Sequence, residues 1–211
     1  MSDNHTKMQR GWVLPLIAVA CVVMLLIAVI GGFVAWKAGF FNRPPLPGEP
    51  IVYFKGSESN PQVAAEFNPK YPPNLARLVK HQNIQMLALW RPPTAESQFE
   101  VLRELPRLWL VELYNTELTN RGAQFVATAH QIEHIIIDGA AITGDGLVAI
   151  ATMPRIRSLV VARCPITDQD LAELAKCNTK LEELYIRDTG VTEAGVQLLK
   201  ESWKYTKVFR Y

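Results

Sequence analysis

Residues 108–122, LWLVELYNTELTNRG, share a pattern with IEHIIIDGAAITGDG at 132–146, IRSLVVARCPITDQD at 156–170 and LEELYIRDTGVTEAG at 181–195. Each segment has apolar residues at its first, fourth and sixth positions, and a branched apolar residue followed by threonine at its eleventh and twelfth. Ile84, Leu87 and Leu89 repeat the first half of the pattern, so the first positions lie 24, 24, 24 and 25 residues apart. Self-similarity at such a period indicates a repeat architecture built from one supersecondary unit.

The threonine of each segment is predicted to be the N-cap of a short helix. Glycine or aspartate stands three residues after it, and apolar residues such as Leu147 and Ile150 follow at helical spacing. A threonine hydroxyl in this place accepts a hydrogen bond from an amide two or three residues on, and a first-turn acid such as Asp145 suits the helix dipole. The predicted structural N-caps are Thr119, Thr143, Thr167 and Thr192.

Each unit is therefore a short strand, a turn and a short helix. No unit can bury its apolar positions alone, so neighbouring units must stack. We expect an α/β fold in which the units form a right-handed solenoid, with a parallel sheet inside and short helices outside. The domain is predicted over residues 74–211, with about five to six units.

The repeat resembles the leucine-rich repeat in the form L-x-x-L-x-L-x-x-[CNT]-x-x-[IL]-T-x-x-G-[LA]. This is the cysteine-containing subclass of F-box proteins, bacterial GALA-type effectors and mitochondrial subunit-s-like proteins. The turn position of the motif is Thr116, Ala140, Cys164 and Thr189 in the four segments, so Ala140 departs from it. The resemblance covers residues 75–211 and implies a solenoid scaffold that binds partners, while leaving the partner open.

A membrane span is predicted before the repeats. Residues 12–36, WVLPLIAVACVVMLLIAVIGGFVAW, contain no charged residue, and as a helix they exceed the ~30 Å of a bilayer core. The stretch is longer than the apolar region of a cleaved signal peptide, so we interpret it as an uncleaved signal anchor after a short tail, residues 1–11. The charges of the tail favour a cytoplasmic N-terminus with the repeats on the opposite side. Small residues at Ala28, Gly31, Gly32 and Ala35 make the span a candidate face for a weak homodimer.

Residues 37–73 are predicted to be a proline-rich stalk. Eight of the 14 prolines lie between Asn42 and Pro73, which limits both helices and central strands. Two alternatives stay open. In one, Ile51–Phe54 or Val63–Phe67 packs on the domain as an N-terminal cap, and in the other the stalk folds back into the groove of the solenoid.

Several classes of function are excluded by the sequence. A formal net charge of +2 without runs of like charge argues against nucleic-acid binding. His130-Gln-Ile-Glu133-His134 spells a zinc-protease signature, but Ile132 and Ile135 occupy strand positions of the repeat, and a helix there would break it. The turn position of Cys164 indicates a structural thiol. We therefore expect no catalytic residues, no metal and no cofactor.

The inner face of the sheet is the candidate binding surface. Residues two, four and six after each first position face it, because side chains alternate along a strand. This set is unusually aromatic and apolar for a surface in water, as interaction hot spots are. The candidate partner-binding residues are Trp90, Tyr114, Ile136, Val160, Tyr185, Arg187, Phe209 and Tyr211.

These features predict a membrane-tethered, non-catalytic leucine-rich-repeat module for protein–protein interaction. The alternative is a structural or assembly subunit of a larger membrane complex, by resemblance to the subunit-s-like proteins. The last strand, Tyr205–Tyr211, has no helix after it, so its edge is a second candidate for pairing with another chain.

Overall fold

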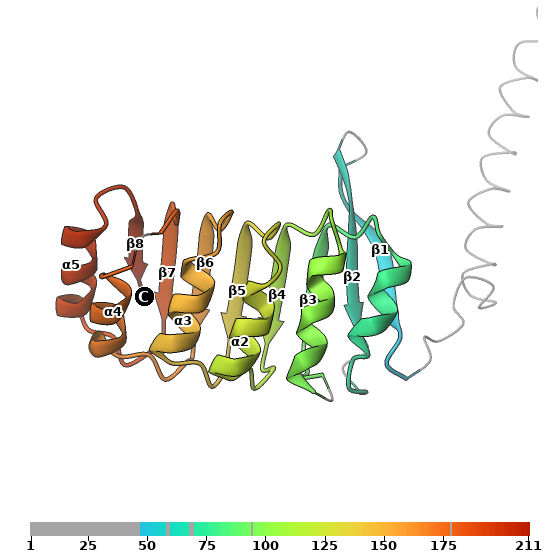
Figure 1. Ribbon diagram of the computed structural model, residues 1–211, viewed down its shortest axis with the longest axis horizontal. Coiled ribbons are helices and arrows are strands. Elements are labelled where there is room, and N and C mark those ends of the chain that lie inside the picture. The colour runs from blue at the N-terminus through green and yellow to red at the C-terminus, as the bar shows by residue number, and fades with distance from the viewer. Residues whose placement is uncertain (1–46, 58–59, 68–69, 94, 178) are drawn as a thin grey trace, which may run out of the picture. The chain divides into compact units, whose positions relative to one another are not determined.

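The computed structural model describes residues 47–57, 60–67, 70–93, 95–177 and 179–211. These residues belong to the second of two compact units, Pro45–Tyr211. The unit is an α/β structure with one eight-stranded, mostly parallel sheet and short helices (Figure 1). The strands are β1 (Pro50–Ser57), β2 (Asn60–Phe67), β3 (Met86–Leu89), β4 (Leu110–Tyr114), β5 (His134–Asp138), β6 (Ser158–Ala162), β7 (Glu183–Arg187) and β8 (Lys207–Arg210). The helices are η1 (Leu75–Lys80), η2 (Glu96–Glu104), α2 (Asn120–Ala127), α3 (Gly144–Ala151), α4 (Asp168–Leu174) and α5 (Glu193–Ser202), of which η1 and η2 are 3-10 helices.

The order of the strands in the sheet is their order in the chain. β2 to β8 run parallel, and the register matches equivalent positions of the repeats: Val111 pairs with Ile135, Ile135 with Leu159 and Leu159 with Leu184. The predicted 24-residue alignment is thus confirmed by the pairing of the strands. An α/β sheet with sequential parallel strands is compatible with the predicted solenoid.

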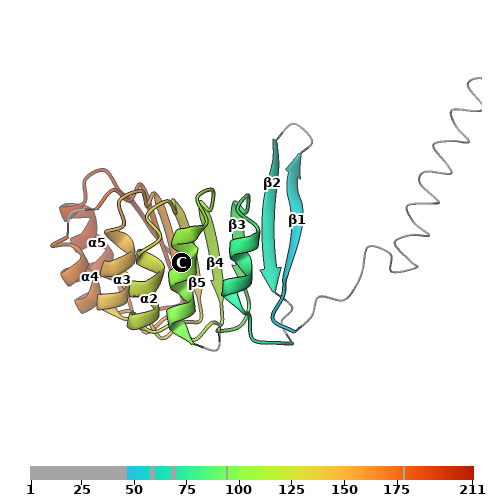
Figure 2. The same ribbon diagram turned by 45° about the vertical axis from the view of Figure 1, so that its right-hand side comes forward.

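The core lies between the sheet and the helices, which cover one face of the sheet (Figure 2). The first, fourth and sixth positions of the segments supply it, and Leu108, Val111 and Leu113 are fully buried. Helix residues such as Val126, Ile150 and Leu199 close it from the other side. At about 25 cal/mol for each Å² removed from water, these aliphatic side chains are the main stabilising contribution to each repeat.

A left-handed residue directly follows each of the strands β4 to β7. Asn115, Gly139, Arg163 and Asp188 hold equivalent positions directly after β4, β5, β6 and β7, with φ values of 50°, 71°, 50° and 50°. Asn115, Arg163 and Asp188 are not glycine, so these three turns store some backbone strain. The turn reverses the chain from the strand toward the helix layer and fixes where the side chain that follows the strand points.

Within residues 37–73, predicted as a stalk, β1 and β2 instead fit the alternative in which Ile51–Phe54 or Val63–Phe67 packs on the domain as an N-terminal cap. β1 and β2 form an antiparallel hairpin, and Ala64 to Glu66 of β2 pair in parallel with Met86 to Ala88 of β3. The prolines are compatible with these strands. Pro50 is the first residue of the edge strand β1, and Pro61 lies outside the part of β2 that pairs with β3. β1 and β2 therefore extend the sheet as an N-terminal cap and do not lie in the groove of the solenoid.

Within the part of the chain that the structure describes, no helix is long and apolar enough to cross a bilayer. The predicted tail at 1–11, the span at 12–36 and its small-residue dimer face lie outside the described residues.

Candidate functional site

The face of the sheet without helices, called here the open sheet face, carries the predicted binding residues. Ile136, Val160, Tyr185 and Phe209 form one row across β5 to β8. Beside this row is a hollow of about 370 Å³, called here the hollow. Its lining consists of Tyr114, Ile136, Asp138, Val160, Ala162, Tyr185, Arg187 and Tyr211.

Two aromatic pairs extend the hollow on both sides. Trp90 stacks on Tyr114 with ring centroids 5.6 Å apart, and Phe209 stacks on Tyr185 at 4.8 Å. Six of the eight predicted residues line the hollow, and Trp90 and Phe209 join it through these stacks. The structure thus brings the whole predicted set into one patch. Trp90 and Tyr211 remain 39% and 71% exposed, so the patch is accessible.

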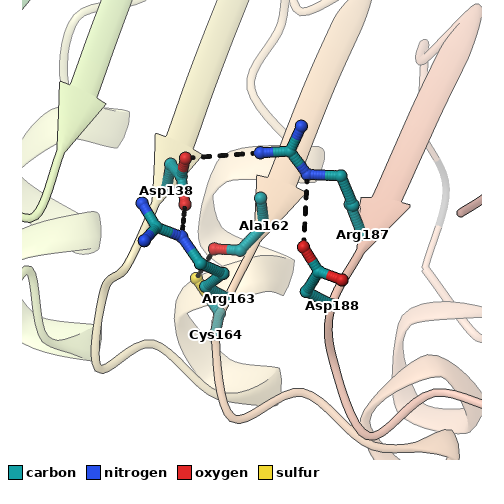
Figure 3. Close-up of polar contacts among 6 residues, drawn as sticks. All are labelled: Asp138, Ala162, Arg163, Cys164, Arg187 and Asp188. Atoms are coloured by element: carbon teal, nitrogen blue, oxygen red, sulfur yellow. Dashed lines mark hydrogen bonds and ion pairs between the residues drawn. The ribbon is translucent and has the colours of Figure 1, made fainter.

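A charged cluster, drawn in Figure 3, borders the hollow, because Asp138 and Arg187 belong to its lining. Asp138, at the end of β5, is 7% exposed. Its two carboxylate oxygens accept hydrogen bonds from Arg163 Nε at 2.6 Å and from Arg187 Nη2 at 3.5 Å. Arg187 Nε also lies 3.5 Å from a carboxylate oxygen of Asp188. One buried carboxylate therefore fixes two half-exposed guanidinium groups beside the apolar hollow.

Sequence reasoning missed Arg163. Arg163 is not in a strand, so the alternation of side chains says nothing about it. It reaches the open sheet face from the left-handed position after β6. The sequence did contain a signal. The equivalent residues after the four strands are Asn115, Gly139, Arg163 and Asp188, and Arg163 is the one with a long side chain.

The other end of the open sheet face is acidic. Glu66 of β2, Ala88 of β3 and Glu112 of β4 stand side by side in one row, the same row that continues to Ile136. Tyr53 of β1 donates a hydrogen bond to Glu66 Oε2 at 3.4 Å. Glu66 was missed because it lies in the segment predicted as stalk.

The pKa values of the tyrosines reflect these neighbours. Partial burial, followed by the charge of Glu66, raises the pKa of Tyr53. Partial burial, followed by the charges of Glu112 and Asp138, raises the pKa of Tyr114. A hydrogen bond to Glu183, 3.0 Å away, and then burial raise the pKa of Tyr185. All three phenols stay neutral donors at physiological pH.

A small apolar cluster covers the first strands on this face. Met86 and Leu110 are 9% exposed, and Trp109 packs against their cluster. The Trp109 ring meets the His134 ring edge-on at 5.4 Å. His134 thus lies in β5, and His130 precedes the strand, so the two histidines are not one turn apart on a helix.

Side chains that could together bind a metal ion do not cluster in the described part of the chain. Among those residues, no three His, Cys, Asp or Glu side chains form a potential metal site. Cys164 is buried, its Sγ donates to the Ala162 carbonyl oxygen at 3.2 Å, and burial raises the pKa of its thiol. A neutral buried thiol in a turn is consistent with a packing role.

The four predicted cap threonines directly precede α2, α3, α4 and α5. The Thr119 hydroxyl accepts from Gly122 N–H, and the Thr192 hydroxyl accepts from Ala194 N–H. Thr143 and Thr167 are held by side chains: Asn120 donates to the Thr143 hydroxyl at 2.7 Å, and the Asp170 carboxylate accepts from Thr167 N–H at 2.8 Å. These residues position the helices and lie away from the hollow.

A scan against protein-family models finds no match, and a search of curated proteins finds no similar sequence.

Proposed function

We propose that this chain is a leucine-rich-repeat protein that binds a protein partner through the open sheet face and has no catalytic activity of its own. The patch formed by the hollow and its two aromatic stacks carries the proposal. Exposed clusters of tyrosine, tryptophan and arginine around an apolar centre have the composition of binding hot spots. We further propose that residues 12–36 tether the chain to a membrane, with the N-terminus cytoplasmic and the repeats on the other side.

Substitution of Tyr114 and Tyr185, which both line the hollow, tests the proposal. Tyr114→Ala with Tyr185→Ala removes one member of each aromatic stack, and capture of the partner from a detergent extract should fall by at least about tenfold. The matched control is Tyr71→Ala with Tyr205→Ala, because these tyrosines are 40% and 96% exposed and do not line the hollow. Equal capture by both variants, with unchanged circular dichroism, would rule out the open sheet face as the binding surface.

One observation favours a second function, that of a subunit in a larger assembly. Among the described strands, β8 is the last of the sheet and pairs only with β7, so the outer edge of β8 offers backbone groups to another chain. Blue-native electrophoresis separates the two functions. Co-migration with a large complex favours the subunit, and migration as a free monomer or dimer favours the binding module.

A further inference from the structure

The charges on the open sheet face are balanced at one end and unbalanced at the other. Toward β8, Arg163 and Arg187 share Asp138, and Lys207 Nζ lies 3.5 Å from Glu183 Oε1. Toward β1, Glu66 and Glu112 have tyrosines as neighbours. Among the described side chains, neither of these two carboxylates is paired with a cation.

The two carboxylates flank the same strand, β3. They stand on β2 and β4, two strand spacings or roughly 9–10 Å apart, and Ala88 of β3, which is 9% exposed, lies between them. The stacked rings of Trp90 and Tyr114 border this place, since Tyr114 lies on β4 two residues after Glu112. Carboxylates beside aromatic faces are the usual environment for a guanidinium or ammonium group.

The distance from the Glu66–Glu112 pair to the hollow determines how far apart a cationic and an apolar residue must be on a bound peptide. This pair centres on β3, and the hollow is lined from β4 to β7. Two to three strand spacings of about 4.8 Å separate their centres, which an extended chain at about 3.3 Å per residue covers in about three or four residues.

We propose that the open sheet face binds an extended segment of a partner protein, in which an arginine or lysine enters between Glu66 and Glu112 and a large apolar side chain enters the hollow. The proposal rests on the binding function proposed above and adds the chemistry of the partner. Complementary charge gives orientation and selectivity, and the apolar side chain contributes most of the affinity.

An array of short glycine–serine peptides tests this chemistry with the full-length protein in detergent. Each peptide carries one phenylalanine and one arginine, and the number of residues between them differs from one peptide to the next. A matched set of peptides carries glutamate in place of arginine. We expect about tenfold stronger binding of the arginine peptides, greatest when the two residues are about three or four positions apart. Stronger binding of the glutamate peptides, or no binding of either set, would overturn the proposal.

Glutamate-to-glutamine variants test whether Glu66 and Glu112 cause the preference for arginine peptides. Glu66→Gln with Glu112→Gln keeps the size of both side chains and should abolish the preference for arginine. The control, Glu193→Gln with Glu201→Gln on α5, should keep it. If the double variant at 66 and 112 still prefers arginine, the cation site is elsewhere and the proposal fails. The tyrosine experiment above is independent of these charges, so failure here leaves the binding function itself standing.

Discussion

At the scale of residues, the side chain of the first helical residue in one repeat acts on the next repeat. Glu96 accepts hydrogen bonds from the amide and hydroxyl of Thr119, and Asp168 does the same for Thr192. Asn120 accepts from Thr143 N–H at 2.8 Å and Gly146 N–H at 3.2 Å. The starts of α2, α3 and α5 are therefore capped by the preceding repeat, which couples neighbouring units.

This arrangement explains the glycine three residues after most of the threonines. A Cβ at Gly146 would lie 2.7 Å from Asn120 Oδ1, and Cβ atoms at Gly122 and Gly195 would collide with Glu96 and Asp168. In the α4 repeat the capping side chain comes from the repeat itself, and the glycine lies in the preceding repeat. The preceding repeat has Gly144 where others carry the capping side chain, and Asp170 fills the space and accepts from Gly144 N–H at 2.8 Å.

Removal of one capping side chain should destabilise the domain measurably. Asn120→Ala leaves Thr143 N–H and Gly146 N–H without this acceptor, and we expect a loss of about 1–2 kcal/mol in the free energy of unfolding. Urea denaturation measures it. Gln124→Ala, on the exposed side of α2, is the control and should change stability by less than about 0.5 kcal/mol. Equal effects of the two substitutions would contradict the capping role.

The cap at Thr192 should make stability depend on acid pH. Hydrogen bonds from the Thr192 hydroxyl and amide lower the pKa of Asp168. Because the folded pKa lies below the unfolded value of about 3.9, the stabilisation is complete above that value and is lost as the pH falls through the folded pKa. Melting temperatures below about pH 4 should therefore fall less steeply in Asp168→Asn than in the wild type. If the melting temperatures of Asp168→Asn and the wild type fall equally with pH, Asp168 does not contribute to the acid dependence of stability.

At the scale of elements, the β1–β2 hairpin protects the first strand of the repeats. Without it, β3 would be an open edge next to the core, where Ala65 and Phe67 now lie at 1% and 4% exposure. The hairpin thus closes one end of the core, as terminal units of repeat proteins must.

Truncation of the Phe67 ring tests whether the hairpin is part of the folded domain. Phe67→Ala should cost about 3–5 kcal/mol of stability, because a buried ring leaves a cavity that relaxes only in part. Tyr71→Ala, whose side chain is 40% exposed, is the control and should have a small effect. If thermal denaturation gives the same midpoint for the Phe67 variant and the wild type, the hairpin is only a flexible spacer.

The parallel strands could be predicted from the sequence because their signal is local and repeated. Apolar residues at a fixed spacing determine both the face and the register, as the pairing of Val111 with Ile135 shows. The hairpin could not be predicted in this way. Its prolines weaken the strand signal, and their compatibility with an edge depends on which residues pair with β3.

The candidate site was predictable to a similar degree. Alternation along the strands places Tyr114, Ile136 and Tyr185 on the open sheet face. The charged partners depend on tertiary structure: Arg163 reaches Asp138 from a left-handed turn, and Glu66 reaches the same face only because the hairpin joins the sheet.

At the scale of the whole molecule, helices cover one face of the sheet, and the other face carries the hollow. The formal net charge of +2 does not describe this face, where acidic and basic groups are separated along the sheet. Recognition of a partner in this account depends on a local apolar hollow with oriented charges at its ends.

The most direct test of binding at the open sheet face is site-specific photo-crosslinking in the full-length protein. A photoreactive phenylalanine analogue replaces Ile136 in the hollow, and in a parallel sample Gln124 on α2, on the opposite side of the sheet. We predict a discrete protein adduct after irradiation of the Ile136 sample and none for Gln124. Adducts only at Gln124, or equal adducts at both positions, would contradict the account.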